Sequence, residues 1–176
     1  LKEKGVIRKL GVSCHMPATA IKLVETGIFD LLLFSINPAY DFEPAEKTLD
    51  QLIAATPTQG QPSPERERLY QLCGARGVGI TVMKALAAGK LLDPATTPFH
   101  RPLTVAQCIH YALSKPGVAS VLLGVQSVAE LEDALGYFDA SEEERDFSFL
   151  AQEMQGSLSH RGMYCNHCLP CPQHID

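Results

Sequence analysis

The sequence has no apolar stretch long enough to cross a bilayer, and its first residues, LKEKGVIRKLGV, contain no apolar core of the kind found in signal peptides. It also lacks an excess of positive charge. The net charge of the 176 residues is −5, which gives no electrostatic reason to expect nucleic acid or an anionic membrane as a partner. Together these absences predict a soluble cytoplasmic protein with neither kind of partner.

The six cysteines do not have the dense pattern of a secreted disulfide scaffold. Three of them are scattered, as is typical of small core side chains: Cys14, Cys73 and Cys108. The other three follow a strict three-residue spacing near the end of the chain: Cys165, Cys168 and Cys171. A cluster of this kind in a cytosolic protein favours a metal site over disulfides.

Strand-like and helix-like segments alternate along the chain. Apolar and β-branched runs predict strands at residues 5–13, 29–37, 78–86 and 118–125. Helical spacing of apolar residues predicts helices at residues 18–28, 63–77, 104–117, 127–138 and 141–155. The polar segment 38–63 is predicted to be a long loop with one helical turn around residues 49–55.

Capping residues support three of these helix starts: Ser63 before Pro64, Thr104 with Gln107, and Ser127 with Glu130. The helix at 127–138 has an apolar face made of Leu131, Ala134, Leu135 and Phe138. Such a face is expected to pack against the sheet.

Four βα units in succession predict an α/β fold with a parallel sheet, equal to half of a (βα)8 barrel. A four-stranded doubly wound sheet is the alternative, but the GxGxxG fingerprint typical of that fold is absent from the sequence. The predicted organisation is a half barrel at residues 1–140, followed at residues 141–176 by a helix and a short cysteine-rich tail.

Five motifs in one order carry a family resemblance: IRKLGVSCH, FDLLLFSINPAYD, GVGITVMKALAAGKLL, PGVASVLLGVQSVAELEDAL and the cysteine tail. The chain resembles the C-terminal half of an aldo/keto reductase, within the subgroup that has a ferredoxin-like [4Fe–4S] tail. The resemblance implies strands five to eight of a (βα)8 barrel, a nicotinamide cofactor and a small carbonyl or alcohol substrate.

The resemblance also implies which residues bind the nucleotide. Ser13 matches the serine that contacts the nicotinamide carboxamide, and Asn37 matches the asparagine of a Tyr-Asn motif. Met83 takes the position that supports the nicotinamide ring.

Residues nearer the phosphates match too, since residues 85–90 correspond to the loop along the pyrophosphate. The cofactor-binding candidates there are Lys84, Gly89 and Lys90, and those in the adenosine-phosphate loop are Gly124 and Ser127. Lys84 at a strand end also allows a Schiff-base role, against the simpler interpretation of a lysine facing phosphate or solvent.

Four positions depart from the family pattern: Cys14 for asparagine, Leu33 for glutamine, Glu130 for the arginine that takes a 2′-phosphate, and Ala134 for the asparagine near the adenine. These departures favour NAD, or no nucleotide, over NADP.

The tail sequence Cys165-x2-Cys168-x2-Cys171-Pro resembles the ferredoxin run that binds an iron–sulfur cluster. The first cysteine of the family pattern is replaced by Gly162. A fourth ligand would come from a further cysteine or from one of the nearby histidines, His160, His167 and His174. Two alternatives remain: a zinc site of three thiolates with His174, and a reduced tail without metal.

The catalytic residues of the family lie on strands one to four, which have no match in this chain. Hydride transfer needs a proton donor near the carbonyl oxygen, so the chain alone is predicted to be inactive. We therefore expect the cofactor-binding half of an NAD(P)-dependent oxidoreductase, with catalytic residues upstream of Leu1. The alternative is a non-enzymatic half barrel that binds a metal or cluster or mediates an interaction.

A half barrel exposes two unpaired strand edges and one sheet face, which is expected to be apolar. The sequence therefore predicts a homodimer or association with a missing barrel half. The opening residues LKEKG are typical of the end of a helix and indicate that further sequence precedes them.

Overall fold

The computed structural model describes residues 1–42 and 63–153, in which a four-stranded parallel sheet forms the centre. Its strands are β1 (Gly11–Ser13), β2 (Leu31–Ser35), β3 (Gly79–Met83) and β4 (Val118–Val121). They lie in the order β1-β2-β3-β4, and every neighbouring pair is parallel. All four strands lie within the segments predicted from the sequence.

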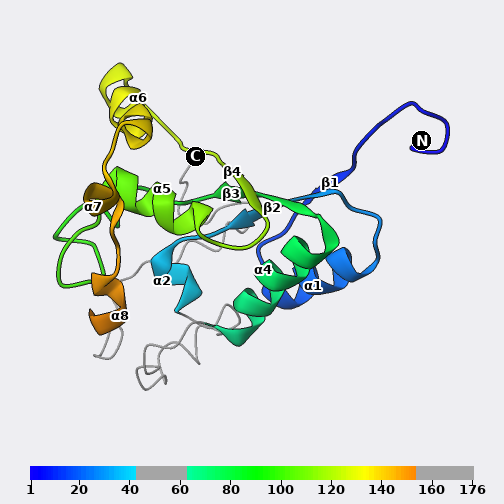
Figure 1. Cartoon of the computed structure of the whole chain (residues 1–176), viewed down its shortest axis with the longest axis horizontal. Helices are drawn as coiled ribbons and strands as arrows, with labels where there is room; N and C mark the ends of the chain where they lie inside the picture. The colour runs from blue at the N-terminus through cyan, green and yellow to red at the C-terminus, as the bar shows by residue number, and fades with distance from the viewer. Residues whose placement is uncertain (43–62, 154–176) are drawn as a thin grey trace, which may run out of the picture.

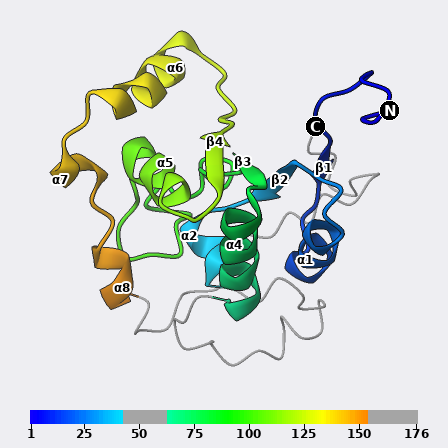
Figure 2. The same ribbon diagram turned by 45° about the vertical axis from the view of Figure 1, so that its right-hand side comes forward.

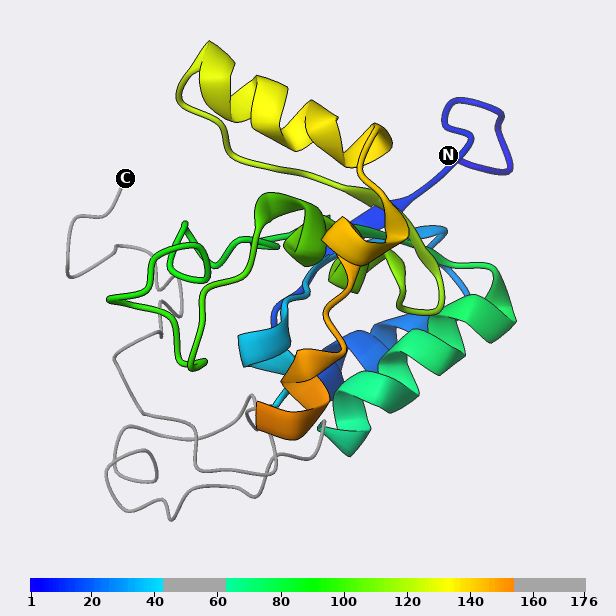
Figure 3. The same cartoon turned by 60° about the vertical axis from the view of Figure 1, so that its left-hand side comes forward.

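The helices lie beside this sheet (Figure 1). They are α1 (Pro17–Glu25), α2 (Pro38–Asp41), α4 (Pro64–Arg76), α5 (Val105–Leu113), α6 (Val128–Leu135), the 3₁₀ helix η1 (Gly136–Phe138), α7 (Glu142–Arg145) and α8 (Phe149–Glu153). Helices α1 and α4 lie side by side in contact (Figures 1 and 3).

The strand order distinguishes the two predicted architectures. Each strand follows its sequence neighbour, and a crossover between adjacent parallel strands is right-handed in nearly all proteins. All the crossover helices therefore fall on one face, whereas a doubly wound sheet reverses its strand order to cover both faces. The half-barrel prediction is confirmed, and the doubly wound alternative is wrong.

The helix-covered face of the sheet holds the core. Leu32 and Phe34 of β2, with Ile80 and Val82 of β3, are completely buried there. The residues between them point to the other side, which is called the inner face here. Leu31 is 43% exposed on this face, so the prediction of a strand buried on both sides is wrong for the described residues.

The inner face is mixed rather than apolar. The strand register places one row of mostly hydroxyl-bearing residues across it: Ser13, Leu33, Thr81 and Ser120. The Ser120 hydroxyl donates to the Thr81 hydroxyl at 3.1 Å. The face that was expected to be apolar therefore has apolar residues such as Leu31 and Leu33, and it also carries three hydroxyl groups in this row.

Two outer strands are shorter than predicted, and local side chains explain one of them. The Asp30 carboxylate accepts a hydrogen bond at 2.9 Å from the Leu10 backbone N–H, which satisfies that donor outside a ladder. Gly5 has φ +68, and the chain turns there. Strand β1 therefore begins only at Gly11.

The capping predictions have different outcomes. Thr104 and Gln107 form the predicted capping box at the start of α5. The Ser127 hydroxyl accepts from the Glu130 N–H as predicted, but the Glu130 carboxylate accepts from the Gln126 N–H. Ser63 makes no side-chain cap bond, although Pro64 occupies the first turn of α4.

The helix predicted at 141–155 is interrupted. The Asp146 carboxylate accepts hydrogen bonds from both the N–H and the hydroxyl of Ser148. This local turn competes with helix propagation, so the segment forms α7 and α8 instead.

Helix α6 and the adjoining η1 carry an exposed apolar stripe, which we call the apolar stripe of α6. It consists of Val128, Leu131, Leu135 and Phe138, which are 72%, 46%, 52% and 75% exposed. None of the residues of α6 is buried, and the helix stands at the outer margin of the molecule (Figures 1 and 2). The predicted packing of this face against the sheet is wrong for the described part of the chain.

The predicted turn at 49–55 and the cysteines of the tail lie outside the described residues, and the division at residue 140 stays a prediction. No helix in the described ranges is both long and apolar enough to cross a membrane.

Candidate functional site

The carboxyl ends of the four strands meet at one edge of the sheet, where barrel proteins of this kind place their functional residues. Ser13 is the last residue of β1 and is exposed. Ser35 ends β2, is 4% exposed, and pairs directly with Met83, the last residue of β3. Two predicted site residues, Ser13 and Met83, therefore flank the end of β2.

A histidine approaches this edge from the segment after β1. His15 Nδ1 lies 3.3 Å from the Ser35 hydroxyl, within hydrogen-bonding distance. The neighbouring Cys14 is buried, and its thiol donates to the Met16 carbonyl at 3.4 Å. The His15 and Ser35 pair adds polar atoms to this edge, and Ser35 was not among the predicted site residues.

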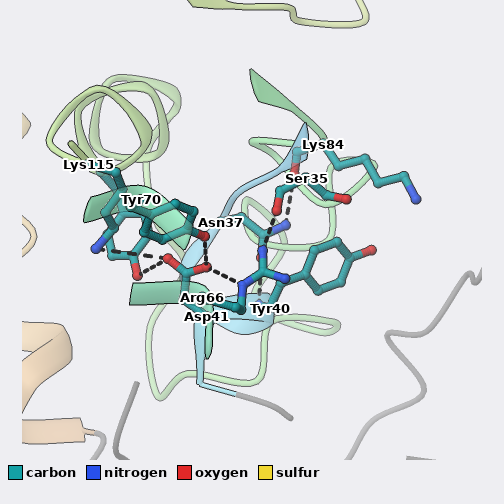
Figure 4. Close-up of polar contacts among 9 residues, drawn as sticks. Ser35, Asn37, Tyr40, Asp41, Arg66, Tyr70, Lys84 and Lys115 are labelled. Atoms are coloured by element: carbon teal, nitrogen blue, oxygen red, sulfur yellow. Dashed lines mark hydrogen bonds and ion pairs between the residues drawn. The ribbon is translucent and has the colours of Figure 1, made fainter. Parts of the chain in front are cut away.

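Asn37 and Lys84, two further predicted site residues, are in direct contact (Figure 4). Asn37 is completely buried and caps α2, with its Oδ1 accepting from the Tyr40 N–H at 3.0 Å. Its Nδ2 donates to the Lys84 carbonyl oxygen at 2.8 Å. The side-chain amide of Asn37 thus joins the segment after β2 to the segment after β3.

The segment after β3 has an unusual backbone. Three of its non-glycine residues have positive φ: Lys84 at 61°, Ala87 at 49° and Ala88 at 56°. Gly89, a predicted site residue, has φ 82° and is free of steric cost there. The Lys90 carbonyl accepts a hydrogen bond from the Thr96 hydroxyl at 3.0 Å, which holds the far end of the turn.

The two predicted residues after β4 lie where the chain enters α6. Apart from its two chain neighbours, no described residue has an atom within 4 Å of a Cβ built on Gly124, so there is open space beside this glycine. The Ser127 hydroxyl is engaged in capping α6. Both residues follow the carboxyl end of β4, as the other candidates follow β1 to β3, but they lie next to α6 at the outer margin of the molecule.

A buried polar cluster lies beneath the edge, centred on Asp41 (Figure 4). The Asp41 carboxylate accepts from Arg66 Nε at 2.7 Å, from the Tyr70 hydroxyl at 2.6 Å and from the Tyr111 hydroxyl at 2.8 Å. Lys115 Nζ is 3.9 Å away. Because Asp41 and Arg66 are only 2% and 3% exposed, their charges are compensated by each other and by these hydroxyls.

The cluster shifts the ionisation of its members. Burial raises the pKa of Tyr70 and of Tyr111, and the Asp41 carboxylate raises both further. Burial alone would lower the pKa of Arg66, but Tyr70 and Asp41 outweigh it and raise that pKa. Burial lowers the pKa of Lys115 against the opposing pull of Asp41. Both phenols therefore stay neutral donors at physiological pH, which suits a structural role.

Arg66 connects this cluster to the candidate site, because its Nη2 donates to the Ser35 carbonyl oxygen. The sequence contained a signal for the cluster that the prediction missed. Arg66 shares the buried face of α4 with Leu69, Tyr70 and Cys73, and an arginine on an apolar stripe needs a buried partner.

A cavity of about 490 Å³ lies between α4 and the end of α5, bordered by Asp41, Arg66, Glu67 and Lys115 among others. It lies among helices rather than at the carboxyl edge. Among residues 1–42 and 63–153, no group of histidine, cysteine and acidic side chains is arranged to bind a metal. Cys73 and Cys108 are core side chains, and burial raises their pKa to about 11 and about 12.

The fold matches a solved structure, the aldo-keto reductase AKR11C1 from Bacillus halodurans in its holo form. The TM-score is 0.58 at 19% sequence identity, and the match covers 93% of this chain and 56% of the other. This chain therefore has the fold of roughly half of that protein. No family model matches the sequence, and no curated protein matches it.

Proposed function

We propose that this chain is the nucleotide-binding half of an NAD(P)-dependent aldo/keto reductase-like oxidoreductase acting on a small carbonyl or alcohol. The observation that carries the proposal is the carboxyl edge of the sheet. There the consecutive parallel strands bring Ser13, Asn37, Met83 and Lys84 to one side of a fold shared with part of an aldo-keto reductase. The activity as a whole requires the remainder of a barrel, including a proton donor for the carbonyl oxygen.

NAD is favoured over NADP by the start of α6. The Glu130 carboxylate accepts from the Gln126 N–H at 2.7 Å and so lies at the turn where the family resemblance expects a 2′-phosphate. A carboxylate at that position would repel a phosphate. The Ser127 hydroxyl already caps the helix by accepting from the Glu130 N–H. This turn therefore suits the ribose hydroxyls of NAD better than the 2′-phosphate of NADP.

A second barrel half fits the open side of the sheet better than a second copy of this chain does. The row of the inner face that contains Leu31 has little side-chain volume. Gly11 and Gly79 flank Leu31 in this row, and the next side chain beyond Gly79 is that of Ala119. Two copies facing each other would leave this row underpacked. Larger inward side chains from a different half would fill it.

Nucleotide binding tests the proposal directly. The natural polypeptide that carries these 176 residues is titrated with NADH and with NADPH, using the fluorescence of the dihydronicotinamide. We expect NADH to bind more tightly than NADPH, and Glu130→Gln to narrow the difference. Ser13→Ala should weaken the binding of both nucleotides by several fold, because it removes one hydrogen bond.

Ser120→Ala is the matched control for Ser13→Ala. It removes the same hydroxyl from the same row of the inner face, but on β4. Its affinity for NADH should stay at the wild-type value. If neither nucleotide binds, the proposal fails and the non-enzymatic half barrel becomes the better explanation. Light scattering gives the molecular mass in solution and so tests the partner. A dimer of this chain alone would favour a second copy over a separate barrel half.

For the tail, we propose that Cys165, Cys168 and Cys171 bind a [4Fe–4S] cluster with one further ligand. Its support is the spacing of the three thiols and the proline that follows. Iron and acid-labile sulfide are measured after anaerobic purification, with Cys168→Ala expected to lose both and Cys73→Ala, in the core, expected to keep both. Stoichiometric zinc would favour the zinc alternative, and the absence of any metal would overturn the proposal.

A further inference from the structure

The backbone of Lys84 is held in a conformation that a lysine rarely adopts. Its φ is 61°, in the left-handed region, where Cβ crowds the peptide group and only glycine is comfortable. Such a conformation persists when surrounding contacts determine it. The contacts at this residue therefore reveal what holds it.

The Lys84 carbonyl oxygen receives two hydrogen bonds. One comes from the Ala87 N–H at 2.9 Å, within the turn itself. The other comes from Asn37 Nδ2 at 2.8 Å, from a different part of the fold. The ladder between β2 and β3 ends one step earlier, where the Ile36 N–H donates to the Met83 carbonyl at 3.3 Å. The Asn37 side chain thus continues the ladder by one link.

The orientation of the Asn37 amide is fixed by its two partners. The Tyr40 N–H requires an oxygen, and the Lys84 carbonyl requires an N–H, so only one orientation satisfies both. Asn37 is completely buried, so water does not compete for these bonds. On the other side of the same segment, Arg66 holds the Ser35 carbonyl, and Asp41 holds Arg66. The backbone segment that carries Asn37 is therefore held in place by buried polar contacts.

We propose that Asn37 is a positioning residue that holds Lys84 in the left-handed conformation and thereby sets the direction of the Lys84 side chain. Figure 4 shows that side chain extending away from the Asp41 cluster. If Asn37 loses its donor, the Lys84 backbone relaxes to negative φ and its Cα–Cβ bond swings to a new direction. The predicted change in the Lys84 backbone stands on the contacts alone. Any resulting change in nucleotide affinity rests on the proposed function.

The first measurement is the backbone conformation of Lys84 in the natural polypeptide with lysine-selective isotope labels. Two variants are compared with the wild type. Asn37→Ala removes both amide bonds, whereas Asn37→Asp keeps an oxygen for the Tyr40 N–H and replaces the N–H donor to the Lys84 carbonyl with a second carboxylate oxygen. In both variants the Lys84 Cα chemical shift and amide coupling constant should leave the left-handed range.

The second measurement uses Lys84→Gly, which relieves the strain because glycine has no Cβ. In the wild-type background, Lys84→Gly should raise the folding equilibrium constant by about tenfold. In the Asn37→Ala background, Lys84→Gly should leave the folding equilibrium constant unchanged. Ala88→Gly is the matched control, since Ala88 also has positive φ but no bond to Asn37. Its gain should be the same in both backgrounds.

The third measurement is NADH affinity, which should fall about tenfold in Asn37→Asp. If Lys84 keeps its left-handed signals in both variants and the Lys84→Gly gain is unchanged, the positioning role is overturned. If the wild type binds no nucleotide, the proposed function fails, and the backbone and stability measurements still decide the role of Asn37.

Discussion

Helices α5 and α6 have the same kind of sequence but opposite surroundings. Each begins with a hydroxyl residue that accepts from the backbone three residues later, and each has apolar residues at helical spacing. In α5 these residues are buried, with Cys108 and Ala112 at 0% exposure. In α6 none is buried. Helical spacing therefore identifies which face of a helix seeks a partner, whereas whether that partner belongs to the described chain depends on the fold.

The largest expected difference comes from truncating one apolar residue on each helix. Ile109→Ala on α5 removes a side chain that is 6% exposed and should lower the free energy of unfolding by about 2–5 kcal/mol. Leu131→Ala on α6, where the leucine is 46% exposed, should cost less than about 1 kcal/mol in the 176-residue chain. Denaturant titration measures both. Equal costs would mean that α6 is covered in solution.

A smaller difference is expected from a tyrosine hydroxyl on α5. Tyr111→Phe removes the bond to the Asp41 carboxylate at 2.8 Å and should cost about 1.5–3 kcal/mol, because the acceptor is charged and buried. Tyr137→Phe, just after α6, removes a contact of 3.3 Å with His110 and is the control. Thermal unfolding of the two variants should differ clearly. If Tyr111→Phe matches its control, the Asp41 cluster does not anchor α5.

The caps provide a third comparison, of about 1 kcal/mol each. Thr104→Ala should lower global stability, because α5 is part of the packed core. Ser127→Ala should instead weaken protection only in α6, since unfolding of an unpacked helix is local. Amide hydrogen exchange distinguishes the two. Slow exchange throughout α6 in the Ser127→Ala variant would contradict the idea that α6 opens independently.

The smallest effect is a loss of stability in alkali that comes from the buried thiol of α5. Burial raises the pKa of Cys108 from 9.0 to about 12, so its stabilising effect is complete below pH 9 and is lost as the pH rises toward 12. At about pH 9.5 the loss should be under about 1 kcal/mol. Cys108→Ala should flatten this part of the stability profile. An unchanged profile would show that the thiol is not shielded.

Local patterns predicted local features well. The pairing of Thr104 with Gln107 was correctly predicted as a capping box, since both residues and both bonds lie within one turn. The apolar run through Leu32 and Phe34 correctly predicted a central strand. The order of strands and helices then sufficed to predict a parallel half barrel, because the handedness of crossovers leaves few alternatives.

Features that depend on distant partners were not predictable in the same way. Asp41 reaches Arg66, Tyr70 and Tyr111, which are 25 to 70 residues away in sequence. The left-handed backbone of Lys84 depends on Asn37, 47 residues earlier, and a lysine gives no hint of positive φ. The predicted nucleotide contacts of Asn37 and Ser127 remain predictions, although the structure gives both side chains structural bonds.

The sequential strand order has a consequence for how the protein is made. Among the described strands, each one after β1 pairs with the strand synthesised before it, so this sheet can grow in step with translation, from β1 to β4. The sequence separation between paired strands is then only that of one strand–helix–strand connection, which keeps the contact order low. Strand β4 completes this growth, and α6 follows with its apolar stripe uncovered. A chaperone that recognises nascent apolar surface would therefore still find an exposed stripe on α6 after the four strands have paired.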